Sequence, residues 1–411
     1  MTEKRNMRLE CDVGLPASKS ESNRALMIAA YGGFAPDFQN LSDSNDTSVI
    51  AKALSVCGAC HAPQIVDIED CGTAARFMLS FLASHNGEWL LKGSARMGQR
   101  PIAPLVDALQ LLGADVQYIE KQDFLPLRIF GKPLTGGKVA IDMSQSSQFA
   151  SSLLLSAPMW HQGAEIELFG SLSSLPYLDM TIALMRHFGA NVQRRGRIVV
   201  VEPKPYQYHE FTVSPDWSAA SYWFEVAALS EACEIRLRGV KRLSLQGDAI
   251  IAEWMKTLGV TCEEIGNDLV LSKMPAENRP HSFDFNSCPD LFPTMVATCA
   301  GLQLDACFTG VANLRIKESD RVEAMRMELA KIGAELKYHS ENELVLKPSK
   351  VLPFFEKSNP LFFESHGDHR VVMALAPLSL RLGALTFDHP EVVRKSYPKF
   401  WDDACFLPII R

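Results

Sequence analysis

One pattern recurs along the whole chain: a helical stretch ends in glycine and a short apolar strand follows it. The four clear copies carry Gly113, Gly189, Gly259 and Gly333, which are 76, 70 and 74 residues apart. Gly58 and Gly383 mark two weaker copies, at spacings of 55 and 50 residues. Glycine ends a helix in a left-handed conformation without strain. The spacing favours an internal repeat of helix, glycine, strand, turn and strand; ordinary α/β texture is the alternative.

Six such units are too many for one hydrophobic core in a chain of 411 residues. Two domains of about three units each are therefore expected. A polar stretch rich in proline, from 202 to 216, lies near the middle of the chain. It is the best candidate for the segment that connects the two domains.

Charge and composition exclude several classes of protein. Forty-one Lys and Arg against 48 Asp and Glu leave a net charge of −7, which argues against a nucleic-acid binder. No apolar run reaches the roughly 18 residues of a membrane span, and residues 1–13 lack a signal-peptide core. We therefore expect a cytoplasmic protein.

Ten scattered cysteines suit reduced thiols. The pair Cys57 and Cys60, followed by His61, lacks the second pair that a zinc site needs.

Five polar clusters stand where helices are expected to begin. They are 18–24, 71–76, 144–148, 317–321 and 367–370, and four of them include Lys or Arg in or near the first turn. A helix N-terminus offers free N–H groups and a positive dipole end, which together favour anions. A single cluster of this kind is more simply an N-cap. Five of them predict an anion-binding site.

The cluster at 317–321 is the most suggestive of the five. Lys317 and Arg321 are four residues apart, so they are predicted to share a helical face. Glu318 lies between these cations, which would keep it ionised and suited to proton transfer. A surface ion-pair cluster is the alternative. Asp320 and Glu323 fit a capping box.

Eleven short motifs then occur in the order of a known family. They are Ser18–Leu26 (SKSESNRAL), Asp46-Thr47, Gly72–Arg76 (GTAAR), Gln99–Pro101 (QRP), Ser146–Phe149 (SSQF), Ser174–Tyr177 (SLPY), Gln246–Asp248 (QGD), Pro289-Asp290, Asn313–Arg321 (NLRIKESDR), Asp368–Arg370 (DHR) and Lys395–Pro398 (KSYP). Over nearly its whole length the chain resembles the 5-enolpyruvylshikimate-3-phosphate (EPSP) synthases, which are enolpyruvyl transferases.

The resemblance implies an α/β fold with two domains, an inside-out α/β barrel in which each domain is built from three βαβαββ units. One domain would span 17–215, and the other 1–16 together with 216–411. The active site would lie in the cleft between them. The implied reaction moves the enolpyruvyl (carboxyvinyl) group of phosphoenolpyruvate to the 5-hydroxyl of shikimate 3-phosphate and releases phosphate. No metal or organic cofactor, nucleic acid or membrane is implied, and a monomer is expected.

The resemblance also assigns residues. The implied catalytic residues are Asp290 as base, with Glu318 and Lys19 as proton donors. The implied shikimate 3-phosphate site comprises Lys19, Ser20, Arg24, Ser146, Ser147, Gln148, Ser174, Tyr177, Asp290, Asn313 and Lys317. The implied phosphoenolpyruvate site comprises Lys19, Gly72, Arg100, Gln148, Arg321, Arg370 and Lys395. Seven of these residues are lysine or arginine. Their positive charges would balance the negative charge of the two substrates, which is roughly −5 to −6 in total.

Two departures from the family pattern concern the turns before these motifs. Ala17 stands where the family usually has glycine, and Asp70-Cys71 replaces the residues before Gly72. Retention of Gly72 leaves room for phosphoenolpyruvate and for its mimic glyphosate. Two alternatives remain open. A sister enzyme that uses a UDP-amino sugar would carry a cysteine near 97–100, where this chain has none. A non-catalytic anion-binding protein would not need both Asp290 and Glu318.

Overall fold

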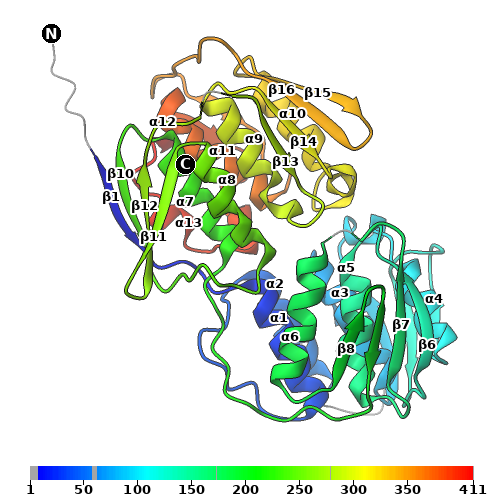
Figure 1. Ribbon diagram of the computed structural model, residues 1–411. Coiled ribbons are helices and arrows are strands. Elements are labelled where there is room, and N and C mark those ends of the chain that lie inside the picture. Colours follow the sequence, from blue (N-terminus) through cyan, green and yellow to red (C-terminus); the bar gives the residue numbers. More distant parts are fainter. Residues whose placement is uncertain (1–7, 58–62, 173, 278, 411) are drawn as a thin grey trace, which may run out of the picture. The chain divides into compact units, whose positions relative to one another are not determined.

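The computed structural model describes residues 8–57, 63–172, 174–277 and 279–410. The chain forms two compact units (Figure 1). The first unit is Ala17–Val213, and the second unit is Met1–Pro16 together with Ser214–Arg411. The second boundary therefore falls inside the proline-rich stretch, after Val213 rather than after Pro215. Each unit has its own hydrophobic core.

The first unit contains two four-stranded sheets of the same topology, with strand orders β2-β3-β5-β4 and β6-β7-β9-β8. In each sheet the first pair of strands is parallel and the remaining pairs are antiparallel. The strands are β2 (Gln64–Asp67), β3 (Gly87–Lys92), β4 (Asp115–Tyr118), β5 (Leu127–Gly131), β6 (Gly137–Asp142), β7 (Ala164–Phe169), β8 (Val192–Arg195) and β9 (Ile198–Val201). The helices are α1 (Lys19–Gly32), α2 (Asn45–Val56), α3 (Gly72–Ser84), α4 (Ala103–Leu111), α5 (Ser147–Ser156) and α6 (Leu175–His187).

The second unit repeats this topology in two more sheets, with orders β1-β10-β12-β11 and β13-β14-β16-β15. Its strands are β1 (Leu9–Val13), β10 (Cys233–Leu237), β11 (Val260–Ile265), β12 (Asp268–Lys273), β13 (His281–Asp284), β14 (Ala306–Thr309), β15 (Glu335–Ser340), β16 (Glu343–Lys347), β17 (Leu361–Phe363), β18 (Leu385–Phe387) and β19 (Ile409–Ile410). Its helices are α7 (Trp217–Leu229), α8 (Ile251–Thr257), α9 (Phe292–Gly301), α10 (Arg321–Ala330), α11 (His369–Leu375), α12 (Ser379–Leu382) and α13 (Phe400–Asp403).

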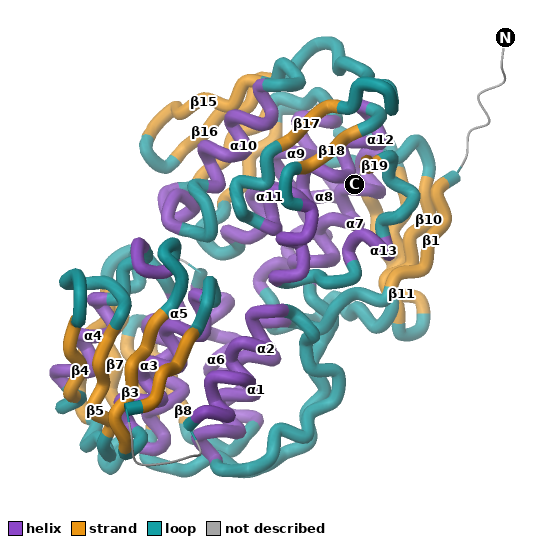
Figure 2. The backbone as a smooth tube through the Cα atoms, turned by 180° about the vertical axis from the view of Figure 1, so that it is seen from behind, coloured by secondary structure: helices purple, strands orange, loops and turns teal. Residues whose placement is uncertain are grey.

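These four sheets are four copies of a βαβαββ unit. In three copies one helix (α3, α5 or α9) connects the two parallel strands, because parallel neighbours need a crossover, whereas between β1 and β10 the chain runs through the whole first unit and then α7. The third copy in each unit is smaller among the described residues. In the first unit it consists of α1, α2 and a bridge between Gln39 and Thr212. In the second unit it has the three parallel strands β17, β18 and β19, of which β17 and β18 lie side by side in Figure 2.

The repeat glycines occupy the expected positions. Gly113, Gly189, Gly259, Gly333 and Gly383 all have positive φ, and each stands between a helix and the strand that follows it. The predicted role at the ends of helices is therefore confirmed, although Gly383, with φ 86° and ψ −139°, is not in the left-handed helical conformation. Gly58, Cys60 and His61 lie outside the described residues.

Helices form the middle of each unit, because their residues are apolar on nearly all sides. In the second unit every residue of α7, α9 and α11 is buried, and these three helices contact one another. In the first unit α1 and α5 contact each other, and each of them also contacts α3 and α6. The sheets lie on the outside of these helices, as Figure 1 shows for β6, β7 and β8.

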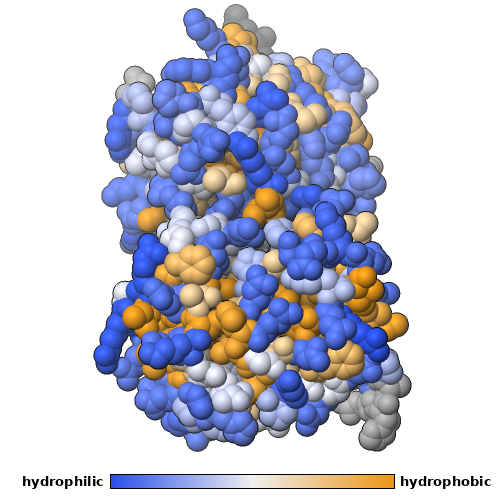
Figure 3. Space-filling model, turned by 90° about the vertical axis from the view of Figure 1, so that its right-hand side faces the viewer, coloured by the Kyte–Doolittle hydropathy of each residue, from blue (hydrophilic) through white to orange (hydrophobic). Residues whose placement is uncertain are grey.

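The surface is of the usual mixed kind. On the face in Figure 3, hydrophobic patches are interrupted by hydrophilic side chains. Exposed apolar residues such as Phe169, Leu243 and Phe354 are common on proteins of this size. Among the described residues, the helices are all too short or too polar to cross a membrane.

Candidate active site

All five polar clusters lie at helix N-termini, as predicted. Ser18, Cys71, Ser146, Asp320 and Asp368 are the N-cap residues of α1, α3, α5, α10 and α11. In each case the side chain accepts a hydrogen bond from a backbone N–H two or three residues later. The caps fix where each helix begins, and so they fix where the basic residues of the first turn stand.

In the first unit, Lys19 is the first residue of α1 and its Nζ atom lies 3.0 Å from Oδ2 of Asp46. The Asp46 side chain is 4% exposed, so this ion pair is largely shielded from water. Asp46 follows the N-cap Ser44 of α2. The pair holds the Lys19 ammonium group at the junction of two helix N-termini.

Arg24 is a fully engaged buried cation one turn further along α1. Its Nε donates to Thr181 Oγ1 at 2.7 Å, and its Nη groups donate to the carbonyls of Ser20 and Tyr177 at 3.0 and 3.2 Å. Burial lowers the pKa of Arg24 to about 10, so it remains a cation near neutral pH. The guanidinium thus ties α1 to the start of α6.

Gly72, at the start of α3, lies directly beneath two guanidinium groups. A Cβ atom at this position would lie 2.6 Å from Nη1 of Arg100 and 2.8 Å from Nη1 of Arg76. Arg76 donates to the carbonyls of Gly72 at 2.9 Å and of Pro101 at 3.3 Å. It therefore links the first turn of α3 to the loop that carries Arg100. Asp70, one of the departures from the family pattern, accepts a hydrogen bond from Ser94.

The remaining predicted residues of the first unit stand at the starts of α5 and α6. Ser147 is the first residue of α5, and Gln148 Nε2 donates to Thr73 Oγ1 in α3 at 3.0 Å. Ser174 precedes α6 with a left-handed φ of 57°, a conformation that costs energy for a residue other than glycine. Tyr177 lies in the first turn of α6, where its carbonyl binds Arg24.

In the second unit, Arg321 forms ion pairs with three carboxylates. Arg321 has Nη1 at 2.8 Å from Asp290, Nη2 at 2.8 Å from Glu318 and Nε at 2.8 Å from Asp368. Arg370 adds a further ion pair to Asp290 at 2.7 Å. Four of the predicted residues, Asp290, Glu318, Arg321 and Arg370, thus form one network, which also includes Asp368.

The electrostatics of this network keep its central carboxylate charged. Burial raises the pKa of Asp290, but the positive charges of Arg370, Arg321 and Lys317 outweigh burial and hold it well below its usual range. Asp248 has the opposite shift, because burial and the charge of Asp290 raise its pKa. Two nearby carboxyls whose pKa values are pushed apart are typical of acid–base sites.

One local prediction in this region is wrong. Lys317 and Arg321 do not share a helical face, because α10 begins only at Arg321. Asp320 has extended backbone and caps that helix, so Lys317 and Glu318 precede it. The capping box is half formed: Asp320 accepts from the Glu323 N–H, while the Glu323 carboxylate pairs with Arg326.

Two predicted residues stand in short 3-10 helices of the second unit. Asn313 lies within Ala312–Ile316, and Lys395 ends Pro390–Lys395. The predicted residues are thus divided between the two units: Lys19, Ser20, Arg24, Gly72, Arg100, Ser146, Ser147, Gln148, Ser174 and Tyr177 belong to the first, and Asp290, Asn313, Lys317, Glu318, Arg321, Arg370 and Lys395 to the second.

Several buried carboxylates contact or influence this set without having been assigned a role from the sequence. Three of them are Asp46 beside Lys19, Asp248 near Asp290, and Asp368 on Arg321. Each belongs to one of the quoted motifs, so the motifs contained the signal. The pairing did not follow from the sequence, because the partners are 27, 42 and 47 residues away.

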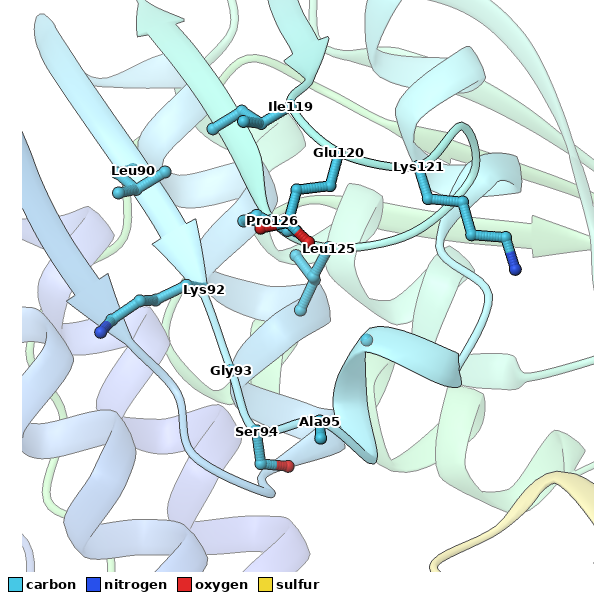
Figure 4. Close-up of a pocket in the computed structure, with 11 residues that line it drawn as sticks. Leu90, Lys92, Gly93, Ser94, Ala95, Ile119, Glu120, Lys121, Leu125 and Pro126 are labelled. Atoms are coloured by element: carbon cyan, nitrogen blue, oxygen red, sulfur yellow. The ribbon is translucent and has the colours of Figure 1, made fainter.

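A cavity of about 520 Å³ in the first unit lies outside these clusters (Figure 4). Leu90, Ile119 and Leu125 form its apolar side, and the Lys92 and Lys121 side chains extend away from its centre. It includes Gly98, two residues before Arg100, but the predicted site residues do not line it. The cavity therefore adds no group to the candidate site.

Comparison with known proteins agrees with this architecture. The family model of EPSP synthase (3-phosphoshikimate 1-carboxyvinyltransferase) matches residues 4–404. A 3-phosphoshikimate 1-carboxyvinyltransferase of Bacteroides fragilis is 40% identical over 399 residues, covering 96% of this chain and 95% of that protein. Another, from Mannheimia succiniciproducens, is 35% identical over 424 residues, covering 96% of each.

Solved structures share the fold. EPSP synthase from Acinetobacter baumannii superimposes with a TM-score of 0.74 at 21% identity, covering 98% of this chain and 96% of that one. The enolpyruvyl transferase NikO from Streptomyces tendae gives 0.69 at 17% identity, covering 97% and 95%. The predicted α/β fold class, that of the enolpyruvyl transferases, is therefore confirmed. The family match over nearly the whole chain and the identity of up to 40% to these relatives lead to one conclusion: the chain belongs to the EPSP synthase family.

Proposed function

We propose that this protein transfers the enolpyruvyl group of phosphoenolpyruvate to the 5-hydroxyl of shikimate 3-phosphate and releases phosphate. It is a transferase of the shikimate pathway, which leads to chorismate and the aromatic amino acids. Family membership supports the reaction. The structural observation that carries the proposal is the network in which Arg321 and Arg370 surround Asp290 and Glu318.

The charges of the two clusters suit these substrates. Each substrate carries a phosphate and a carboxylate, so their repulsion must be balanced by cations. The first unit supplies Lys19, Arg24 and Arg100 beside helix N-termini, and the second supplies Lys317, Arg321, Arg370 and Lys395. These positive groups are also suited to stabilise charge on the departing phosphate. The overall charge of −7 does not oppose this local arrangement.

We assign the chemical steps as addition followed by elimination. Asp290 takes the proton from the 5-hydroxyl as its oxygen attacks C2 of phosphoenolpyruvate, while the methylene carbon C3 is protonated by Lys19, or by Glu318 once it has taken up a proton. The tetrahedral adduct then loses phosphate, which takes up the proton held by Asp290, and the group that protonated C3 takes one proton back from it, which restores the double bond. The residues proposed to bind shikimate 3-phosphate are Lys19, Ser20, Arg24, Ser146, Ser147, Gln148, Ser174, Tyr177, Asp290, Asn313 and Lys317. The residues proposed to bind phosphoenolpyruvate are Lys19, Gly72, Arg100, Gln148, Arg321, Arg370 and Lys395.

Phosphate release in the presence of both substrates tests the function. We expect turnover with shikimate 3-phosphate as acceptor, none when it is omitted, and none when a UDP-amino sugar replaces it. Release with the UDP-amino sugar instead would assign the protein to the sister activity. Calorimetric binding of both substrates without any turnover would show an anion-binding protein and would overturn the proposal.

Substitution of the two carboxylates tests the assigned roles. Asp290→Ala and Glu318→Gln should each lower kcat by roughly 10²–10⁴-fold, the usual contribution of a general acid or base. Glu323→Gln, at the third residue of α10, is the matched control. Its kcat should stay close to that of the unsubstituted enzyme, because the Glu323 carboxylate pairs only with Arg326 among the described residues. Unchanged kcat in either test variant would show that the roles are wrong, provided thermal unfolding confirms that the fold survives.

A further inference from the structure

Arg321 is more completely enclosed than a ligand-binding arginine usually is. Its side chain is 1% exposed, and its Nε, Nη1 and Nη2 atoms each contact a different carboxylate at 2.8 Å. Under the proposed function, an acidic group of phosphoenolpyruvate must approach this guanidinium and that of Arg370. It can do so only if it takes the place of carboxylates that are already there.

The three carboxylates are not equally replaceable. Those of Asp290 and Glu318 are 20% and 18% exposed and contact the terminal Nη atoms. Asp368 is 0% exposed and contacts Nε, the nitrogen on the side-chain stem. Exchange with an incoming anion is therefore open to the first two and closed to Asp368.

Asp368 is also fixed by its own hydrogen bonds. Its Oδ2 accepts from Arg321 Nε at 2.8 Å and from Ser319 Oγ at 3.2 Å. Its Oδ1 accepts from the backbone N–H of Arg370 at 3.0 Å, which makes it the N-cap of α11. One carboxylate thus holds the stem of one arginine and sets where the helix that carries the other begins.

We propose that Asp368 is a positioning residue. It keeps Arg321 and Arg370 aligned while an acidic group of phosphoenolpyruvate replaces Asp290 and Glu318 at their terminal nitrogens. The inference rests on the proposed function and deepens it, because the exchange releases the base and the acid only when substrate is bound. Arg370 and Arg321 depress the pKa of Asp290 in the free protein. Loss of these partners raises that pKa, which makes Asp290 a better proton acceptor.

Asp368→Asn tests the role, because asparagine is also a good N-cap and preserves the start of α11. Without the carboxylate, Arg321 loses its fixed partner. The KM for phosphoenolpyruvate should rise roughly ten- to hundredfold, the size expected for a lost hydrogen bond to a charged group. The KM for shikimate 3-phosphate should stay within about twofold. A merely structural role would lower the amount of active enzyme and leave both KM values unchanged.

Three further variants complete the experiment. Asp368→Ser keeps a capping oxygen and removes the charge, so it should reproduce the effect of Asp368→Asn. Ser319→Ala removes the other donor to Oδ2 but leaves the carboxylate, and should change the KM for phosphoenolpyruvate by less than about threefold. In an Arg321→Lys background, which lacks the Nε contact, Asp368→Asn should have a much smaller effect on kcat/KM.

Each outcome decides the question. Because KM does not depend on how much of a preparation is folded, weakly stable variants still report it. A KM for phosphoenolpyruvate that is unchanged, a rise in both KM values, or full additivity with Arg321→Lys would overturn the positioning role. Folded Asp368 variants that show no turnover at saturating phosphoenolpyruvate would also contradict it. Failure of the unsubstituted protein to turn over in the same assay would instead refute the proposed function.

Discussion

Two buried acids in the second unit show how differently a carboxylate can be accommodated. Asp290 is surrounded by Arg321 and Arg370 and remains ionised. Glu225, in the middle of α7, is 0% exposed, and neither of its carboxyl oxygens has a hydrogen-bond partner among the described residues. Burial therefore raises the pKa of Glu225 well above its usual value. The environment of Asp290 is suited to acid–base chemistry, whereas burial of the Glu225 carboxyl group without a partner lowers the stability of the fold.

Glu225 should make the stability of the second unit fall as pH rises. Above the ordinary glutamate pKa the unfolded chain releases this proton while the folded chain retains it, so each pH unit favours unfolding. Glu225→Gln removes the titration. Between about pH 5 and 7, the unfolding free energy of the variant should therefore decrease less steeply with pH than that of the unsubstituted protein. The difference between the two slopes should be up to about 1.4 kcal/mol per pH unit. Chemical denaturation at several pH values measures this slope.

The exposed Glu231, just after the same helix, provides the control. Glu231→Gln should leave the slope as it is. Equal slopes for Glu225→Gln and the unsubstituted protein would mean that Glu225 is ionised or paired in the folded state.

At the scale of single elements, local signals were reliable where short-range chemistry decides. N-caps and C-terminal glycines act within a few residues, so five helix starts and five helix ends could be predicted. The predicted helical face shared by Lys317 and Arg321 was wrong, because α10 begins at Arg321, four residues after Lys317. A spacing of four residues indicates a shared face only within one helix, and here the cap at Asp320 separates the two residues.

The repeat glycines should differ in how much they tolerate a side chain. Gly259 and Gly333 belong to the same unit and have φ of +86° and +76°, so alanine at either costs about 1 kcal/mol from backbone strain. At Gly259 the added Cβ would also lie 2.4 Å from the carbonyl oxygen of Met274, whereas at Gly333 it would meet only the Ser349 side chain at 3.3 Å. Gly259→Ala should therefore be clearly the more destabilising.

Urea unfolding of the two alanine variants makes this comparison directly. Similar losses at the two positions would show that the backbone next to Met274 adjusts easily, and that the left-handed conformation alone decides the cost.

At the scale of the whole chain, the second unit is assembled from both ends of the sequence. Strand β1 pairs in parallel with β10, with Leu9 opposite Cys233 and Val13 opposite Leu237. Val13 is 3% exposed and belongs to the core of that unit. The chain leaves this unit after Pro16 and returns at Ser214. The first unit, with its own core, should therefore be independent of β1.

Removal of residues 1–13 tests this division. The second unit loses an edge strand and buried apolar surface, so backbone amides of β10, β12 and α7 should exchange with deuterium faster. Amides of α1, α3 and α5 in the first unit should keep their protection. Equal loss of protection in both units would show that they unfold together.

The sequence by itself determined the repeat, the positions of the caps, the α/β class and, through the family motifs, the identity of residues such as Asp290 and Arg321. These properties depend on neighbours in the chain or on residue type. Only the tertiary structure decided which charges meet: that Asp368 holds Arg321, that Asp46 holds Lys19, and that the Glu225 carboxyl group has no hydrogen-bond partner among the residues described. Ion pairs and burial depend on distances across the fold, and no spacing along the chain encodes them.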